Sequence, residues 1–243
     1  TSLMSANNIR STAAARLRRL RSPISTKASM TRPLRLAAVS GGLQRPSKSA
    51  ALAEHLLDLI ADEIPCEQRL VDLGQLAPKL SGTVWRCPLP DAVERELAAV
   101  EQADVLVVAT PVYRGSYTGL FKHFFDFIHQ DALIDKPILL AATGGSERHA
   151  LVIDHQLRPL FSFFQARTLP LGVYATDKDF VDYRLQDEAL VQRARLAVQR
   201  ALPLIELIRH ASPLLADEAI AAGNTNLFFS KINSLDHHAK RTQ

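Results

Sequence analysis

The sequence has few cysteines and no long apolar segment, and both absences restrict what the protein can be. Its two cysteines, Cys66 and Cys87, fit neither a C-x-x-C motif nor a metal-binding spacing. Isolated cysteines of this kind predict reduced thiols in a cytoplasmic protein. No apolar run reaches the roughly 18 residues that a membrane-spanning helix needs, so we expect no membrane partner.

Acidic residues are absent from the first 30 positions, which carry six basic residues. Removing these six charges from the net charge of +4 leaves −2, so the remaining chain is mildly acidic and no nucleic-acid partner is expected. The Arg-, Ser- and Ala-rich composition of this segment is that of an organellar transit peptide. An upstream extension is the alternative that we favour, because Met30 directly precedes the first predicted strand and suits a start. We therefore predict that residues 1–30 are a disordered basic extension.

Short apolar runs alternate with segments of helical periodicity over most of the chain. Strands are predicted at residues 34–40, 67–73, 104–110, 137–143 and 168–174, and helices at 47–61, 91–102, 117–129, 147–165 and 187–210. Residues 74–90, which contain several prolines, are expected to form a long loop. This alternation predicts a three-layer α/β sandwich around a parallel sheet, formed by residues 31–212. Residues 213–243 lose the periodicity and are predicted to be a disordered tail.

The loop after the first predicted strand, residues 40–49, has the composition of an anion-binding turn. Gly41 and Gly42 allow the backbone to approach a ligand, Ser47 and Ser49 offer hydroxyl groups, and the helix that follows offers unpaired N–H groups. The loop is neither a Walker A motif nor a G-x-G-x-x-G fingerprint, and an ordinary polar turn is the alternative. We predict that it binds a phosphate.

Two more strand ends carry similar loops. The segment from Thr110 to Tyr117 begins with an extended Pro-Val-Tyr, whose amides and aromatic ring suit a flat ligand, and Thr143 to His149 is a Gly-rich turn. Each could alone be an unremarkable loop. In an open parallel sheet, however, ligands bind at the carboxyl ends of the strands, where these loops would meet. Their combination therefore predicts one binding site.

The sequence shows no arrangement typical of acid–base or metal catalysis. There is no Ser-His-Asp set and no pair of carboxylates, so no catalytic side chain is predicted. His149 and His155 stand six residues apart and would lie on different faces of a helix, which argues against a metal site.

Pro159 interrupts the predicted helix 147–165, because it lacks an N–H group and its ring crowds the carbonyl of His155. We predict a kink or a wide π-type turn around His155. The histidine could mark a subunit interface or simply bond a neighbouring carbonyl.

Several short motifs together give a specific resemblance. They are Pro46-Ser-Lys-Ser49, Ala109-Thr-Pro-Val-Tyr113, Tyr117-x-Gly-x-x-Lys122, Ala142-Thr-Gly-Gly145 and Asp154-x-x-Leu-Arg-Pro159. Over roughly residues 34–200 the chain resembles the NAD(P)H-dependent FMN reductase family, in particular the reductases of two-component alkanesulfonate and methanesulfonate monooxygenases. The resemblance implies a flavodoxin-like fold with a five-stranded parallel sheet of order 2-1-3-4-5. It also implies that the distortion around His155 lies at a subunit interface near the flavin.

The resemblance further implies which residues bind FMN. One departure is notable, because many relatives have Gly-Ser-x-Arg where this chain has Gly41-Gly-Leu-Gln44. Phosphate binding is therefore expected to rest on Ser47, Lys48, Ser49 and backbone amides, with Arg45 as a substitute cation. The complete predicted set is Ser40, Gln44, Arg45, Ser47, Lys48, Ser49, Pro111, Val112, Tyr113, Arg114, Thr143, Gly144, Gly145 and Ser146.

The implied function is hydride transfer from NADH or NADPH to N5 of FMN, with release of reduced FMN to a flavin-dependent sulfonate monooxygenase. The implied assembly is a cytoplasmic homodimer or homotetramer. The alternatives are an FMN-retaining quinone, azo or chromate reductase, a non-enzymatic flavodoxin electron carrier, and a flavin-binding module that docks partners without catalysis.

Overall fold

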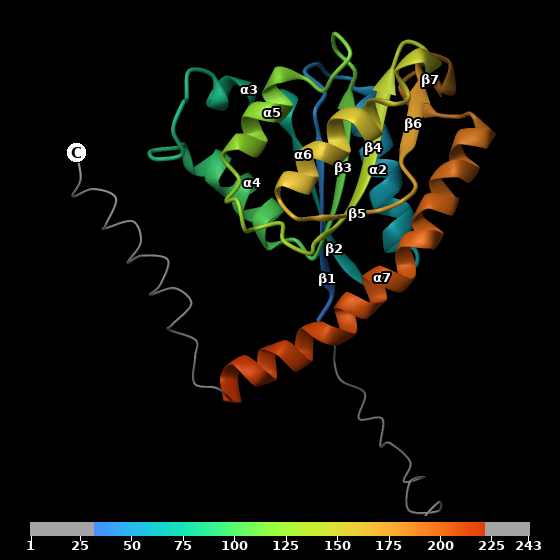
Figure 1. Cartoon of the computed structure of the whole chain (residues 1–243). Helices are drawn as coiled ribbons and strands as arrows, with labels where there is room; N and C mark the ends of the chain where they lie inside the picture. The colour runs from blue at the N-terminus through green and yellow to red at the C-terminus, as the bar shows by residue number, and fades with distance from the viewer. Residues whose placement is uncertain (1–31, 222–243) are drawn as a thin grey trace, which may run out of the picture. The chain divides into compact units, whose positions relative to one another are not determined.

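A parallel β-sheet lies at the centre of the structure (Figure 1), a computed structural model that describes residues 32–221, with side chains up to Arg209. Strands β1 (Leu34–Ser40), β2 (Cys66–Asp72), β3 (Val105–Pro111), β4 (Pro137–Gly144) and β5 (Arg167–Thr168) follow the order β2-β1-β3-β4-β5. The predicted order is therefore confirmed. A sixth short strand, β6 (Val173–Thr176), also pairs with β4 in parallel.

The fifth predicted strand is thus divided in two. Leu169 N still donates to Ile138 O, but Pro170 follows and has no N–H group to continue the ladder. The chain then rejoins β4 at Val173, opposite Ala141. This second contact carries the residues after Thr176 to the carboxyl edge of the sheet.

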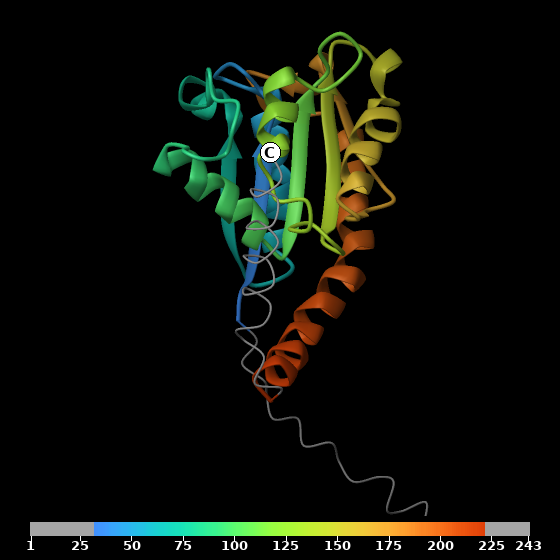
Figure 2. The same ribbon diagram turned by 60° about the vertical axis from the view of Figure 1, so that its left-hand side comes forward.

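Helices cover both faces of the sheet (Figures 1 and 2). Helix α2 (Lys48–Ala61) and the long α7 (Glu188–Ala221) pack on one face, over the side chains of Leu36, Ala38 and Val107. The opposite face carries α3 (Leu73–Leu80), α4 (Asp91–Gln102), α5 (Gly119–Asp126) and α6 (Arg158–Phe163). Because β1, β3 and β4 are buried on both faces, their sequences are continuously apolar rather than alternating.

Helix α3 lies where a loop was predicted. Asp72 Oδ1 accepts a hydrogen bond from Gly74 N and caps the helix, and Leu73, Leu76 and Leu80 are buried against the core. Pro78 stands inside this helix. The prediction was wrong because burial of one apolar side outweighed the low helix propensity of glycine and proline.

The segment predicted as one helix over residues 147–165 is instead three short elements. A 3₁₀ turn, η1 (Glu147–His149), is followed by a π-helix, η2 (Ile153–Leu157), and then by α6. Arg158 N donates to Ile153 O, which is the wide hydrogen bond of a π-turn. The π-turn predicted around His155 is therefore confirmed.

Other boundaries also differ from the prediction. Helix α5 is shorter than predicted, and its start is set by Thr118, whose Oγ1 accepts from Phe121 N and caps it. Helix α7 continues to Ala221, so the start of the predicted C-terminal tail is helical. An unpredicted antiparallel hairpin, β7 (Phe180–Val181) with β8 (Arg184–Leu185), follows η3 (Asp177–Asp179). The predicted extension at residues 1–30 and the rest of the predicted tail lie outside the described residues.

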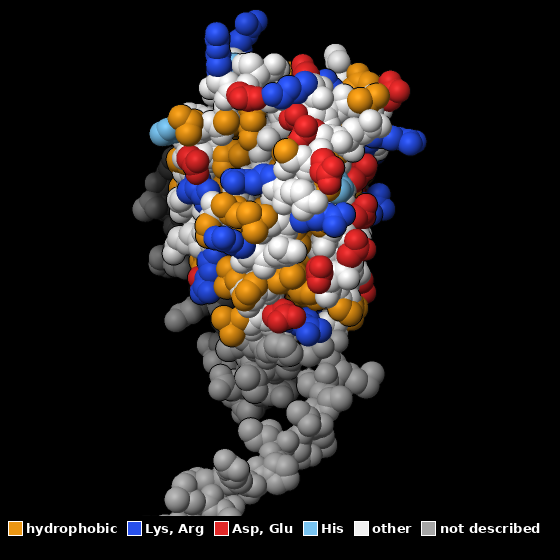
Figure 3. All heavy atoms as spheres, turned by 90° about the vertical axis from the view of Figure 1, so that its right-hand side faces the viewer, with side chains coloured by type: hydrophobic (Ala, Val, Ile, Leu, Met, Phe, Trp, Pro, Cys, Tyr) orange, Lys and Arg blue, Asp and Glu red, His pale blue; other side chains and the backbone are white. Residues whose placement is uncertain are grey.

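Surface features agree with an ordinary folded domain. Cys66 and Cys87 are both free. Within residues 32–221, no helix is both long and apolar enough to cross a membrane. On the face shown in Figure 3, Lys and Arg side chains are interspersed with Asp and Glu.

Candidate functional site

A cavity of about 360 Å³ opens at the carboxyl ends of β1, β3 and β4, within the size range of small-molecule sites. All three loops predicted to meet here contribute to it. Its wall consists of Gly42, Leu43, Gln44, Pro46, Ser47, Lys48, Ser49, Pro111, Val112, Tyr113, Thr143, Gly144, Gly145, Asp177 and Tyr183. Ten of the fourteen predicted binding residues therefore line one cavity.

The first loop ends in a capped helix N-terminus. Ser47 Oγ accepts from Ala50 N at 3.2 Å and caps α2, and the first helical residues, Lys48 and Ser49, line the cavity. A Cβ on Gly42 would lie 2.2 Å from Ser47 Oγ, so the close fold of this loop requires glycine. Buried Ser49 pairs its hydroxyl with Thr143 Oγ1 at 2.7 Å and links the loop to β4. This end of the cavity can bind a phosphate.

Four predicted residues do not line the cavity. Arg45 Nε donates to the carboxylate of Asp72, which directs this cation toward the end of β2. Ser40 is buried, and its Oγ lies 3.5 Å from Gly42 N. Arg114 occupies a turn with a positive φ of 54°, and Ser146 lines a neighbouring cavity. The substitution of Arg45 for the missing arginine thus has no support in this geometry.

The second and third loops form the next part of the cavity wall. Val112 N donates to Thr143 O at 2.7 Å, which ties the two loops together, and Tyr113 is about half exposed at the cavity. A Cβ on Gly144 would lie 2.3 Å from Tyr174 Oη. That hydroxyl donates to Ser146 O at 2.7 Å, and burial raises its pKa. Gly144 therefore lets the backbone pass between Tyr174 and the cavity.

Two residues of the wall were not found by sequence reasoning. Asp177 begins η3, directly after β6, and its Oδ1 lies 2.7 Å from Lys48 Nζ. Tyr183 stands at the tip of the β7–β8 hairpin, where Asp182 and Tyr183 have positive φ values of 48° and 61°. A two-residue turn with positive φ at both positions is the type I′ hairpin, for which an Asp at the first position was a weak signal. The split of the fifth strand brings both residues here, and Pro170 inside the predicted strand was its sequence signal.

Histidines take no part in this wall. His155 is exposed on the π-turn, and His149 lies in η1. Across residues 32–209, where side chains are described, no group of three or more His, Cys, Asp or Glu is placed to hold a metal ion.

Comparison with known proteins supports FMN, the ligand that the sequence motifs imply. Residues 34–181, more than half of the chain, match the family model described as NADPH-dependent FMN reductase. The chain belongs to this family. It is 58% identical over 186 residues to the NADH-dependent FMN reductase SfnF of Pseudomonas fluorescens (strain Pf0-1), which covers 76% of this chain and 98% of that one. It is 54% identical to an FMN reductase (NADPH) of Pseudomonas aeruginosa, with 72% and 94% covered.

Solved structures are similar as well. An oxidoreductase from Corynebacterium diphtheriae has 36% identity and a TM-score of 0.63, with 70% of this chain and 95% of that chain covered. The apo form of the NADH:FMN oxidoreductase EmoB has 31% identity and a TM-score of 0.61, with 72% and 88% covered.

The residues of the cavity fit the flavin that the family uses. A phosphate suits the amides at the start of α2 together with Ser47 and Lys48, and a planar ring suits the border formed by Pro111–Tyr113 and Gly144–Gly145. Gly42 and Gly144 lie so close to Ser47 Oγ and Tyr174 Oη that any larger residue at either position would clash with its neighbour.

Proposed function

We propose that the protein oxidises NADH or NADPH and reduces FMN, which it binds as an exchangeable substrate. The carrying observation is a cavity with a phosphate cradle at one end and a backbone border for a flat ring at the other, both formed at neighbouring strand ends. The cavity is open to solvent beside half-exposed Tyr113, which leaves room for a second ring to stack on the flavin.

The roles of the side chains follow from their positions. Ser47, Lys48 and the first amides of α2 hold the phosphate and fix the flavin along the cavity. Pro111–Tyr113 and Gly144–Gly145 border the ring with their backbone. The amides of Val112 and Tyr113 donate to Thr143 O and Ser116 O, so they hold this border in place rather than bond the flavin. FMN held by these residues would supply N5 as the hydride acceptor, so no side chain of the wall has to transfer a proton.

The partner and the assembly are part of this proposal. Reduced FMN would pass to a flavin-dependent sulfonate monooxygenase, as in the two-component systems whose reductases the sequence resembles. A homodimer or homotetramer is supported by the exposed apolar side chains Leu151 and Phe163, which flank the π-turn. The π-turn lies beside the loop formed by residues 110–117, because Ser116 Oγ donates to Gln156 Oε1 at 3.0 Å. Two free cysteines are consistent with the cytoplasm.

Steady-state oxidation of NADH and NADPH with free FMN, FAD and riboflavin as varied acceptors tests the proposal. We expect saturable oxidation that depends on added FMN and a protein that loses its flavin on dialysis. A protein that stays yellow through dialysis, and reduces quinones, azo dyes or chromate without free FMN, would support the FMN-retaining alternative instead. Absence of nucleotide oxidation with added FMN would favour an electron carrier or a docking module.

A further inference from the structure

The wall of the flavin cavity contains an ion pair that opposes phosphate binding. Lys48 and Asp177 are the only charged side chains among the fifteen residues that line the cavity, and Asp177 Oδ1 lies 2.7 Å from Lys48 Nζ. The one cation at the phosphate end is therefore already neutralised by a carboxylate. A cradle that maximised affinity for an anion would leave this cation unopposed.

Asp177 extends over the cavity rather than supporting its own turn. The capping box of η3 uses the neighbouring residues instead, since Thr176 N and Thr176 Oγ1 both donate to Asp179 Oδ2, at 2.6 and 2.9 Å. The other carboxylate oxygen, Asp177 Oδ2, would lie 3.8 Å from a Cβ on Gly145. Asp177 thus bridges the start of α2 and the end of β4, between the phosphate cradle and the border of the ring.

A flavin phosphate entering this site meets two linked effects. A phosphate monoester carries about −1.5 to −2 charges at pH 7, so it is repelled by the carboxylate and competes with it for Lys48. Asp177 is well exposed, with a side-chain exposure of 64%, so it can leave Lys48 without burying an unpaired charge. The pair therefore weakens binding of the phosphate without blocking it.

We propose that Asp177 is a positioning residue that competes with the FMN phosphate for Lys48 and so keeps FMN exchangeable. This inference rests on the proposed function, because rapid exchange matters only to an enzyme that must release its flavin. Since the effect acts on the phosphate, it applies to FMN and not to riboflavin, which has none.

The test compares binding of FMN and riboflavin to the full-length apoprotein by quenching of flavin fluorescence. In Asp177→Asn we expect the Kd of FMN to fall by about three- to tenfold, as the loss of one partly exposed charge contact predicts, mainly through slower dissociation. The Kd of riboflavin should change by less than about twofold. The gain in FMN affinity should shrink at high salt, because screening weakens the repulsion that Asp177 exerts.

Two further variants make the test specific. Asp182→Asn removes the same charge from the exposed hairpin tip, outside the cavity, where asparagine tolerates the positive φ of 48°. It should leave the Kd of FMN within about twofold. In a Lys48→Met background, Asp177→Asn should increase FMN affinity less than it does when Lys48 is present. Only the direct repulsion between Asp177 and the phosphate then remains to be removed.

An unchanged or weaker FMN affinity in Asp177→Asn would overturn the inference, and so would an equal gain for riboflavin or the same gain in Asp182→Asn. These outcomes leave the proposed function intact if the wild-type protein binds FMN and oxidises NADH or NADPH with it. A wild-type protein that does neither would instead reject the proposed function and the inference together.

Discussion

Ser47 has two separable roles at the scale of the single residue, because its Oγ both caps α2 and faces the cavity. We predict that Ser47→Ala lowers the free energy of unfolding by about 1 kcal/mol through loss of the cap. The same variant should weaken FMN binding by about fivefold or more through loss of a hydroxyl contact. Ser47→Gly serves as the control, because glycine keeps most of the capping preference but has no hydroxyl. FMN affinity that stays unchanged in both variants would show that Ser47 does not hold the phosphate.

Gly144 lies in the part of the cavity wall that is proposed to border the flavin ring. A Cβ there would meet Tyr174 Oη at 2.3 Å, so Gly144→Ala must move Tyr174 or push the backbone into the cavity. We expect a loss of about 1–3 kcal/mol in the free energy of unfolding and a raised KM for FMN, measured by urea unfolding and steady-state kinetics. Gly119→Ala is the control, since its Cβ would meet nothing within 4 Å and α5 gains a better helix former. Equal effects of the two substitutions would contradict this account.

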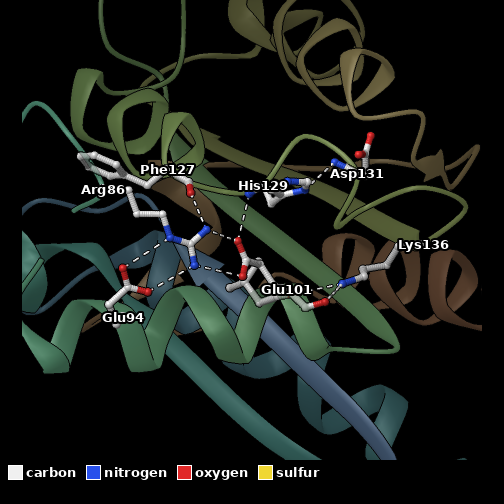
Figure 4. Close-up of polar contacts among 8 residues, drawn as sticks. Arg86, Glu94, Glu101, Phe127, His129, Asp131 and Lys136 are labelled. Carbon is white, nitrogen blue, oxygen red and sulfur yellow. Dashed lines mark hydrogen bonds and ion pairs between the residues drawn. The ribbon is translucent and has the colours of Figure 1, made fainter. Parts of the chain in front are cut away.

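At the scale of the element, Arg86 fastens the segment between α3 and α4 to two helices (Figure 4). Its guanidinium bonds both carboxylate oxygens of Glu101 and of Glu94 on α4, and Nη1 also donates to Phe127 O at 2.9 Å, at the end of α5. The hydrogen bonds that Arg86 donates to Glu101 raise the pKa of Arg86 despite its partial burial. The Arg86 side chain thus links the irregular segment 81–90 to α4 and to the end of α5.

Replacing Arg86 should therefore be costly. We predict that Arg86→Met lowers the free energy of unfolding by about 2–3 kcal/mol, because Glu101 is left partly buried without its partner. Arg167→Met is the control, since Arg167 pairs with Asp135 where both side chains are well exposed, at 48% and 68%, and no buried carboxylate is left behind. It should cost less than about 1 kcal/mol. Comparable losses in urea unfolding would show that the Arg86 network adds nothing beyond a surface ion pair.

At the scale of the whole molecule, Lys136 makes stability depend on pH. Its ammonium is buried at the end of α4, where Nζ donates to Val100 O and Glu101 O at 2.8 and 2.9 Å (Figure 4). Burial lowers its pKa from 10.5 to about 8, although Asp104 and Glu101 act in the opposite direction. Between these two values the unfolded chain binds more protons than the folded protein, so stability rises with pH.

We predict that this one lysine adds about 3 kcal/mol to the free energy of unfolding between pH 8 and pH 10.5. Urea unfolding at several pH values measures the slope, and Lys136→Met removes the contribution of this residue. The difference between wild type and variant should be flat below pH 8 and change above it. Parallel profiles over the whole range would show that the pKa of Lys136 is not lowered by folding.

The sequence by itself determined the central sheet, most of the cavity and the π-turn. Continuous, valine-rich apolar runs such as residues 105–109 predict strands buried on both faces, and the glycines and serines after them mark the strand ends. Pro159 determines the π-turn because a missing N–H group is a local property that needs no tertiary contact. The motifs at three strand ends were sufficient to indicate the family.

The tertiary structure alone decided which polar side chains face the cavity. Arg45 is adjacent to the cradle in sequence, yet it turns to Asp72, whereas Asp177 is 129 residues from Lys48 and bonds it. Helix α3 likewise forms because its leucines find a core to cover, not because its sequence favours a helix. Local patterns record backbone preference and burial, but an ion pair depends on where distant strands end. The pairing of β6 with β4 sets that position, because it places Thr176 opposite Gly144 and so brings Asp177 to the cavity.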